Sequence, residues 1–281
     1  MSKTMKNLLR PGLLTAALFF AAISASAQTY NLNYNYEANK DYIYNITVEN
    51  KMTQEVMGQE MTFNSTMKSV AKMESIGKNE NGNLMFTFSL DSVTVKTSSP
   101  MGDTTIVLND MVGKRIKLEL SPKGRIVKRE VIDSVSGNFM TGSQINRETM
   151  IFLDLPDNEI NIGDTWTVSK SDSIENAGGV FINSGLTTYK LVGMGDYNGC
   201  ECLTVESSSD MNIEGSGSMQ GFDYVAEGSG KSTGTAYFNY EKGVLNGLVQ
   251  KVELQMTLAG TGQQNMIIPI TQEMTTSFKL K

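Results

Sequence analysis

KRIKLELSPKGRIVKREVI, residues 114–132, shows the local pattern from which the rest of the fold can be inferred. Ile116, Leu118 and Leu120 alternate with charged residues before a Lys123-Gly124 turn, and a second alternating segment follows the turn. Strict alternation of apolar and polar residues predicts a strand with one buried face, and glycine supplies the positive φ that a tight turn requires. This stretch is therefore predicted to form an antiparallel hairpin.

The same arrangement recurs at residues 235–258. Tyr237-Phe238-Asn239-Tyr240 leads through Lys242-Gly243 into a second strand, whose apolar positions are Val252, Leu254, Met256 and Leu258. The recurrence predicts two related β halves that end in matching hairpins, either within one shared curved sheet or as separate domains.

Period-two alternation continues through most of the chain after residue 30, as in residues 42–48 and 84–90. Strands with one wet face indicate antiparallel pairing rather than a parallel α/β sheet. The expected fold class is all-β, mainly antiparallel, with a strongly curved sheet or half-barrel made of the two halves. Residues 214–234 are rich in glycine and serine, which is typical either of a flexible linker or of glycine-bearing strands.

One or two short helices are expected as exceptions. Ser143–Leu153 has the spacing of an amphipathic helix that ends before Pro156, and Leu108–Val112 fits a helical turn. The predicted organisation is an N-terminal β half at residues 28–142, a helical connector at residues 143–159 and a C-terminal β half at residues 160–281.

The first 27 residues predict a secretory signal peptide. Lys3, Lys6 and Arg10 precede an apolar run at residues 13–23, and Ser24-Ala25-Ser26-Ala27 provides a cleavage site after Ala27. The apolar run is too short for a bilayer crossing, which needs about 20 residues. The mature chain is therefore expected in the periplasm or outside the cell, without a transmembrane anchor.

Charge argues against two kinds of partner. The full chain has a formal net charge of −6, and removing residues 1–27 deletes three basic residues and no acidic one, which leaves −9. An acidic chain without a polybasic segment offers no electrostatic surface for nucleic acid or for anionic lipid. Neither is expected as a partner.

The sequence contains no histidine, which removes histidine-based catalysis and histidine-ligated zinc. Four carboxylates gather near Pro156: Asp154, Asp157, Glu159 and Asp164. They could flank a sugar in a hydrolase or bind calcium, although the calcium-loop spacing is absent, and a solvated connector explains them more simply. No catalytic, metal-binding or cofactor-binding residue is predicted, and the protein is expected not to be an enzyme.

Two further features have alternative interpretations. Cys200 and Cys202 could be two small residues on one strand face, a strained disulfide, or half of a soft-metal site. Trp166, the single tryptophan, is interpreted as a packing anchor, with ligand stacking as the alternative; no companion aromatic is apparent nearby in the sequence.

Three elements in order carry a resemblance to a known family: residues 112–126, residues 155–166 with Leu155-Pro156 and Gly163-Asp164-Thr165-Trp166, and residues 236–244. Together they resemble a family of exported proteins from Bacteroidetes-type Gram-negative bacteria that is known only as a domain of unknown function. The resemblance implies an exported, β-rich, non-enzymatic protein. It carries over no ligand and no site residue.

The methionines of the first strands bear on function. Met52, Met57, Met61, Met67 and Met73 fall at spacings that do not keep to one strand face, which favours core filling, although methionine-rich surfaces can also hold varied apolar ligands.

The leading hypothesis is a non-catalytic binding or carrier protein of the cell envelope, whose partner is a lipid, another apolar ligand or a partner segment. One alternative is a structural or interaction protein of the envelope without a ligand cavity, and another is a transmembrane β-barrel. The sequence assigns no ligand-binding residue.

Overall fold

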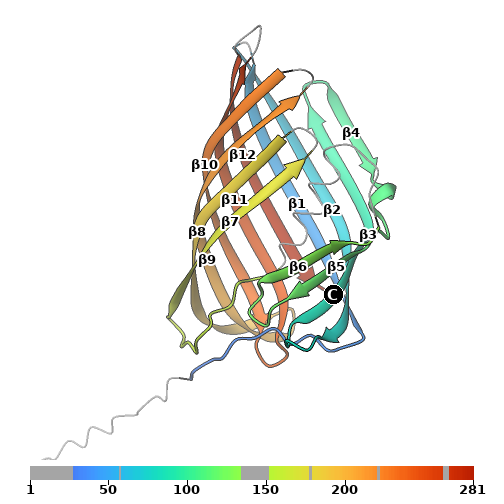
Figure 1. Cartoon of the computed structure of the whole chain (residues 1–281), viewed down its shortest axis with the longest axis vertical. Helices are drawn as coiled ribbons and strands as arrows, with labels where there is room; N and C mark the ends of the chain where they lie inside the picture. The colour runs from blue at the N-terminus through green and yellow to red at the C-terminus, as the bar shows by residue number, and fades with distance from the viewer. Residues whose placement is uncertain (1–27, 57, 134–151, 177–178, 220–221, 262–265) are drawn as a thin grey trace, which may run out of the picture.

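The computed structural model describes residues 28–56, 58–133, 152–176, 179–219, 222–261 and 266–281, and these residues form one 12-stranded sheet (Figure 1). In chain order the strands are β1 (Lys40–Val56), β2 (Gln59–Lys78), β3 (Leu84–Ser99), β4 (Gly102–Val107), β5 (Ile116–Leu120), β6 (Ile126–Val131), β7 (Thr165–Asn176), β8 (Gly179–Tyr197), β9 (Cys200–Met219), β10 (Phe222–Asn239), β11 (Val244–Thr261) and β12 (Met266–Leu280).

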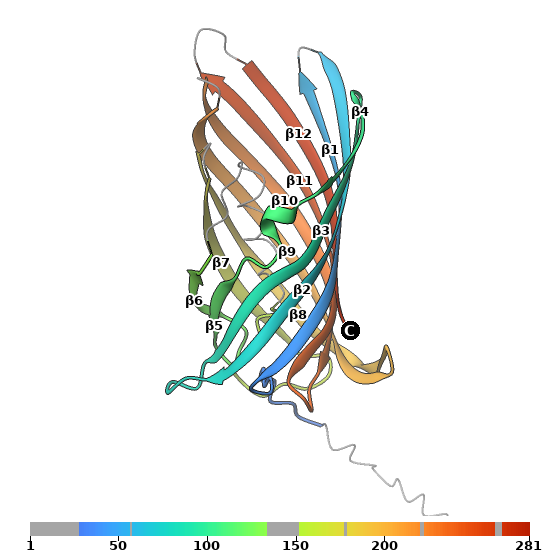
Figure 2. The same ribbon diagram turned by 90° about the vertical axis from the view of Figure 1, so that its right-hand side faces the viewer.

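The sheet is antiparallel throughout and is not closed. Its order is β6-β5-β3-β2-β1-β12-β11-β10-β9-β8-β7, with β4 paired to β3 beside this path, so β6 and β7 are its two edges. A quarter turn of the molecule shows the long strands curving around a common interior (Figure 2). The prediction of an antiparallel, strongly curved sheet or half-barrel is confirmed.

Strands β1 to β6 lie on one side of the β1–β12 pairing and β7 to β12 on the other, so both parts of the chain share one sheet. Its division into two β halves and a connector remains a prediction. The two recurring hairpins form as expected, as β5–β6 and β10–β11. They do not take equivalent places, because β6 is an edge strand whereas β10 and β11 lie in the interior of the sheet. The expectation that the two hairpins are matching ends of the two halves is therefore wrong, because local sequence fixes a hairpin but not its neighbours in the sheet.

A single 3-10 turn, η1 (Asn109–Met111), occurs where a helical turn was expected. The helix predicted for Ser143–Leu153 lies outside the described residues, except for Phe152 and Leu153, which have no regular secondary structure. The predicted signal peptide also lies outside them.

The described residues of the glycine-rich stretch, 214–219 and 222–234, form strand and not linker: they are the end of β9 and most of β10. A methyl group added at Gly230 would collide with the Leu254 side chain, and one at Gly215 would come within 2.6 Å of the Phe181 ring. These glycines therefore make room for large side chains of the neighbouring strands.

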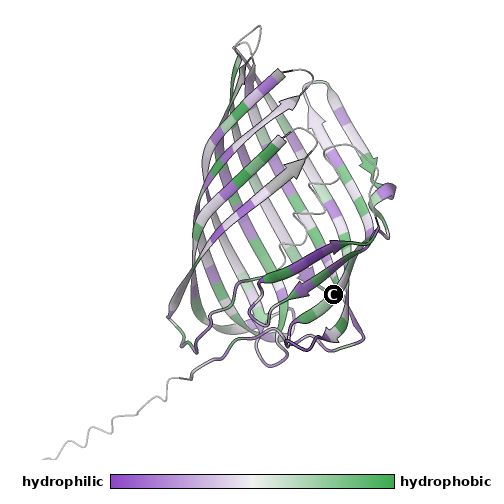
Figure 3. Cartoon of the chain, in the orientation of Figure 1, coloured by the Kyte–Doolittle hydropathy of each residue, from purple (hydrophilic) through white to green (hydrophobic). Residues whose placement is uncertain are grey.

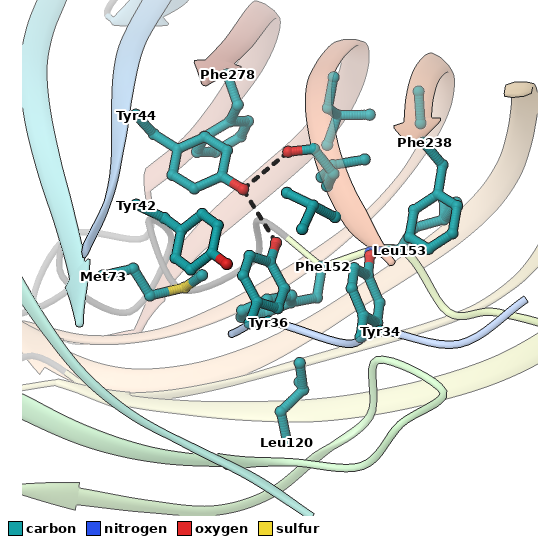
Figure 4. Packing of buried hydrophobic residues seen from close by; sticks show 14 of the residues in the cluster. Tyr34, Tyr36, Tyr42, Tyr44, Met73, Leu120, Phe152, Leu153, Phe238 and Phe278 are labelled. Atoms are coloured by element: carbon teal, nitrogen blue, oxygen red, sulfur yellow. Dashed lines mark hydrogen bonds between the residues drawn. The ribbon is translucent and has the colours of Figure 1, made fainter. Parts of the chain in front are cut away.

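The core fills one end of the curved sheet, which is the lower end in Figure 1, and an N-terminal strap, residues 30–36, runs through it. Tyr30, Leu32, Tyr34 and Tyr36 are buried on alternate positions of the strap. Tyr34 meets Phe152 and Phe238 edge-on, with ring centroids 5.5 and 5.3 Å apart. The strap thus supplies much of the aromatic core (Figure 4).

Hydrogen bonds satisfy the buried phenols of this core. The hydroxyls of Tyr36 and Tyr44 are 3.0 Å apart, and the Tyr44 hydroxyl also donates to the Leu245 carbonyl at 2.8 Å (Figure 4). The Leu153 N–H donates to the Tyr34 hydroxyl at 2.8 Å. Because buried polar groups without partners are costly, these bonds fix the path of the strap.

Both Lys-Gly turns contact the strap. The Tyr34 N–H donates to the Pro122 carbonyl at 2.7 Å and the Lys123 ammonium donates to the Leu32 carbonyl at 2.8 Å, both at the β5–β6 turn. At the β10–β11 turn the Asn35 N–H donates to the Gly243 carbonyl at 2.9 Å. The two recurring turns are thus joined through the strap rather than by symmetry.

Candidate functional site

The sheet extends beyond the core, and its concave side there carries many apolar side chains; we call this surface the upper inner face. Side chains on this face continue the period-two series of Tyr44 on β1 and Phe238 on β10, both of which point into the core. Its apolar members are buried or half-buried: Met52, Met61, Phe63, Phe181, Met211, Ile213, Val252, Leu254, Met256, Leu258, Ile268, Ile270 and Met274.

Strand register joins these side chains into continuous rows. Met52 lies opposite Phe63 on β2 and opposite Gln272 on β12, and Gln272 lies opposite Leu254 on β11. On the far side of Gly230 the same row reaches Met211 on β9. Because directly opposed side chains lie about 5 Å apart, these residues form a continuous row in which the Gln272 amide is the polar member.

Polar side chains also point inward from these strands, among them Gln54, Ser65 and Asn183, and some of the polar groups bond to one another. The Gln272 amide donates to the Asn50 side-chain oxygen at 2.5 Å, and the Thr187 hydroxyl donates to that of Ser209 at 3.2 Å. Polar groups placed among apolar side chains can fix the orientation of a ligand in sites that bind mainly through apolar contact.

The convex side, the outer face, is charged and exposed. One row runs from Lys51 through Glu273 and Glu253 to Lys231 and Asp210, on five neighbouring strands. Apolar and polar residues accordingly alternate along the strands (Figure 3). The sheet is therefore amphipathic, with its apolar side turned inward.

The methionines fall on the inner face more regularly than expected. Met52 on β1 and Met61, Met67 and Met73 on β2 all point inward, and Met73 belongs to the core. The interpretation that their spacing does not keep to one face is therefore wrong. Inward side chains have even residue numbers on β1 and odd residue numbers on β2, so the same face carries Met52 and Met61. Met57 lies outside the described residues.

The carboxylates near Pro156 have separate partners. Asp154 is buried and accepts from the Lys170 ammonium at 2.5 Å. Asp157 is exposed and pairs with Arg125 at 2.9 Å, and this hydrogen-bonded guanidinium lowers the pKa of the Asp157 carboxyl. Asp164 accepts the backbone N–H of Asn161 at 2.7 Å within its own turn.

These contacts give Asp154, Asp157 and Asp164 separate partners, although Asp157, Glu159 and Asp164 all line one open hollow. The fourth acid, Glu159, is exposed. Within the described ranges, no three Asp, Glu, Cys or His residues form a group that could hold a metal ion.

Trp166 is the second residue of β7, and its contacts are those of an anchor. Its indole N–H donates to the Asp154 carbonyl at 2.8 Å, and its ring stacks on Tyr189 with centroids 5.2 Å apart. Tyr189 is the companion aromatic that the sequence did not reveal, because β8 brings it beside Trp166 from 23 positions away. A hollow of about 630 Å³ lies next to this pair, lined in part by Arg125 and Asp157.

Cys200 and Cys202 are free thiols at the start of β9. Cys202 is fully buried, and burial raises the pKa of its thiol to about 11. The Asn239 amide donates to the Cys200 sulfur at 3.4 Å. A buried thiol with a raised pKa is a poor nucleophile, because the thiolate is the reactive form.

Comparisons with known proteins give distant likenesses. No family model matches the chain, and no curated protein matches it. The COG4313 outer membrane channel from Pseudomonas putida F1 is 10% identical over 88% of this chain and 98% of its own, with a TM-score of 0.33. Pseudomonas aeruginosa OpdQ is 8% identical over 86% and 99%, with a TM-score of 0.27.

A DUF1329 family protein from Desulfovibrio piger ATCC 29098 is 11% identical over 84% of this chain and 85% of its own, with a TM-score of 0.14. Membership of a particular family remains a prediction. None of the helical segments in the described ranges is both long and apolar enough to cross a membrane.

Proposed function

We propose that the mature chain is an exported, non-catalytic protein of the cell envelope that binds a lipid-like apolar ligand on the upper inner face. Export to the periplasm or beyond is inferred from residues 1–27, in which basic residues are followed by an apolar run and then by small residues. The ligand site rests on the amphipathic sheet.

The observation that carries the proposal is the continuation of the apolar inner surface beyond the filled core. A sheet buries one face against another layer, and the strap covers that face only at the lower end. Above it, Met52, Phe63, Leu254 and Met256 are half-buried among the described residues. An apolar ligand would complete their burial.

The dimensions suit an acyl chain. From Val48 to Gln54 the inner positions of β1 span six residue steps, or about 20 Å. One leaflet of a bilayer has a hydrocarbon thickness of about 15 Å, half of the whole. Burying about 14 methylene groups gains about 11 kcal/mol, from which association subtracts at least about 4 kcal/mol, so a dissociation constant of about 10 µM or weaker is expected.

The charged outer face also supports a ligand site on the inner side of the sheet. Glu49, Lys51, Glu253 and Glu273 occupy its middle, where a lipid-facing sheet would carry an apolar band. The polar side therefore suits water and the apolar side suits an enclosed ligand.

The proposal is tested on protein purified from its native host. Native mass spectrometry is expected to show a bound species of lipid mass that organic extraction removes, and the extracted protein is expected to take up a fluorescent fatty acid saturably. Bare protein together with no uptake of the probe would refute ligand binding and favour an envelope structural or interaction protein. A group of exposed apolar residues on the outer face is the observation that favours this second candidate.

A further inference from the structure

One region of the outer face departs from its polar character. Val180, Ile182 and Leu186 on β8 are 39%, 46% and 53% exposed, Val225 on β10 is 48% exposed, and Ile267 on β12 is 70% exposed. We call these five residues the outer patch. Their alternation with inward side chains places all of them on the convex side.

Strand register places the members of the outer patch near one another. Val180 lies opposite Ser216, Ser216 opposite Val225, Val225 opposite Ala259, and Ala259 opposite Ile267. This row crosses four strand spacings, about 19 Å, and the β8 side from Val180 to Leu186 is about 20 Å long. The row and the β8 side bound an area of about 400 Å² that also contains polar residues, and the largest apolar patch of a typical monomer, which is often functional, is of this size.

An acidic pair lies inside the patch. Glu214 is directly opposite both Ile182 on β8 and Glu227 on β10, and both glutamates are exposed. Like charges that face each other across a sheet destabilise it. Among the ion pairs formed by described residues, none includes either glutamate. A basic group placed over Glu214 and Glu227 would relieve this repulsion.

We infer that the outer patch docks a segment of a partner protein whose apolar side chains flank at least one lysine or arginine. The acidic pair disfavours an anionic membrane surface, and a symmetric contact between two copies would bring the acidic pairs toward each other. An area of about 400 Å² is half of the usual share of one partner, which fits a short segment and a transient complex.

The probe for this inference is a labelled nine-residue peptide of alternating leucine and lysine, titrated into the mature chain by fluorescence anisotropy. The double variants E214Q/E227Q and I182S/V225S are each expected to weaken binding at least tenfold. E253Q/E273Q is the matched control, because Glu253 and Glu273 are also directly opposed on the outer face but lie outside the patch. Its binding is expected to stay within twofold of the unmodified chain.

Several outcomes would overturn the inference: no binding of the peptide, an equal loss in the control, or equal binding of a peptide with serine in place of leucine, which would show charge attraction alone. A dimer in sedimentation that I182S/V225S disperses would assign the patch to a second copy. Binding to zwitterionic vesicles that I182S/V225S abolishes would assign it to a membrane. Fatty-acid uptake by I182S/V225S is expected to be unchanged, which separates this test from that of the inner face.

Discussion

Replacing Gly124 with alanine is expected to destabilise the fold by about 2–5 kcal/mol. Gly124 has φ +86° in the β5–β6 turn, and a left-handed conformation costs an alanine about 1–2 kcal/mol. The new methyl group would also run into the Leu153 carbonyl oxygen and lie 2.7 Å from the Tyr34 ring. Tyr34 is buried and bonded to Leu153, so neither group can move aside, and overpacking adds about 1–3 kcal/mol.

Gly82 provides the matched control. Its φ is +78°, but a methyl group there would meet nothing within 4 Å, so G82A is expected to cost only the conformational 1–2 kcal/mol or so. Urea unfolding of the mature chain, followed by the fluorescence of Trp166, gives both free energies. If G124A and G82A lost equal stability, the close packing of the strap against this turn would be refuted.

Three further changes test other parts of the structure. Y36F removes a buried phenol–phenol hydrogen bond and is expected to cost about 1 kcal/mol in the same unfolding assay; no loss would show that the bond does not form. Cys202 is expected to react with iodoacetamide far more slowly than Cys200 at pH 8, because burial raises its pKa to about 11, and equal rates would contradict its burial. The Asp157 carboxyl is expected to titrate below its usual range by NMR and to return to it in R125Q. Because its folded pKa is the lowered one, the stability it contributes is present at neutral pH and is lost as the pH falls through that pKa; an unchanged pKa in R125Q would contradict the ion pair.

Much of the fold could be predicted because strand alternation and turn glycines are local signals. The hairpins at Lys123-Gly124 and Lys242-Gly243 formed as expected. Their places in the sheet could not be predicted, because strand order depends on pairings between residues far apart in sequence. The strap has the same period-two pattern as a strand, yet its backbone bonds to the two Lys-Gly turns and to Ile160, which only the assembled fold reveals.

The candidate site shows the same division. Alternation predicted an apolar strand face, but whether Met52 and Met61 point to the same face depends on the number of residues in the turn between β1 and β2. The outer patch required the register of five strands before Val180 and Ile267 could be placed in one row. Buried partners such as Tyr189, beside Trp166, left no signal near the tryptophan in sequence.

The central claim is that the inner face of the sheet, and not the outer face, binds the apolar ligand. Leu254 and Gln255 are neighbours on β11 that point to opposite faces, so L254E and Q255E add the same charge to the same strand on different sides. Each variant, checked for a native circular dichroism spectrum, is titrated with a fluorescent fatty acid. We expect at least tenfold weaker binding for L254E and binding within twofold of the unmodified chain for Q255E; equal affinities in the two variants would contradict the proposed site.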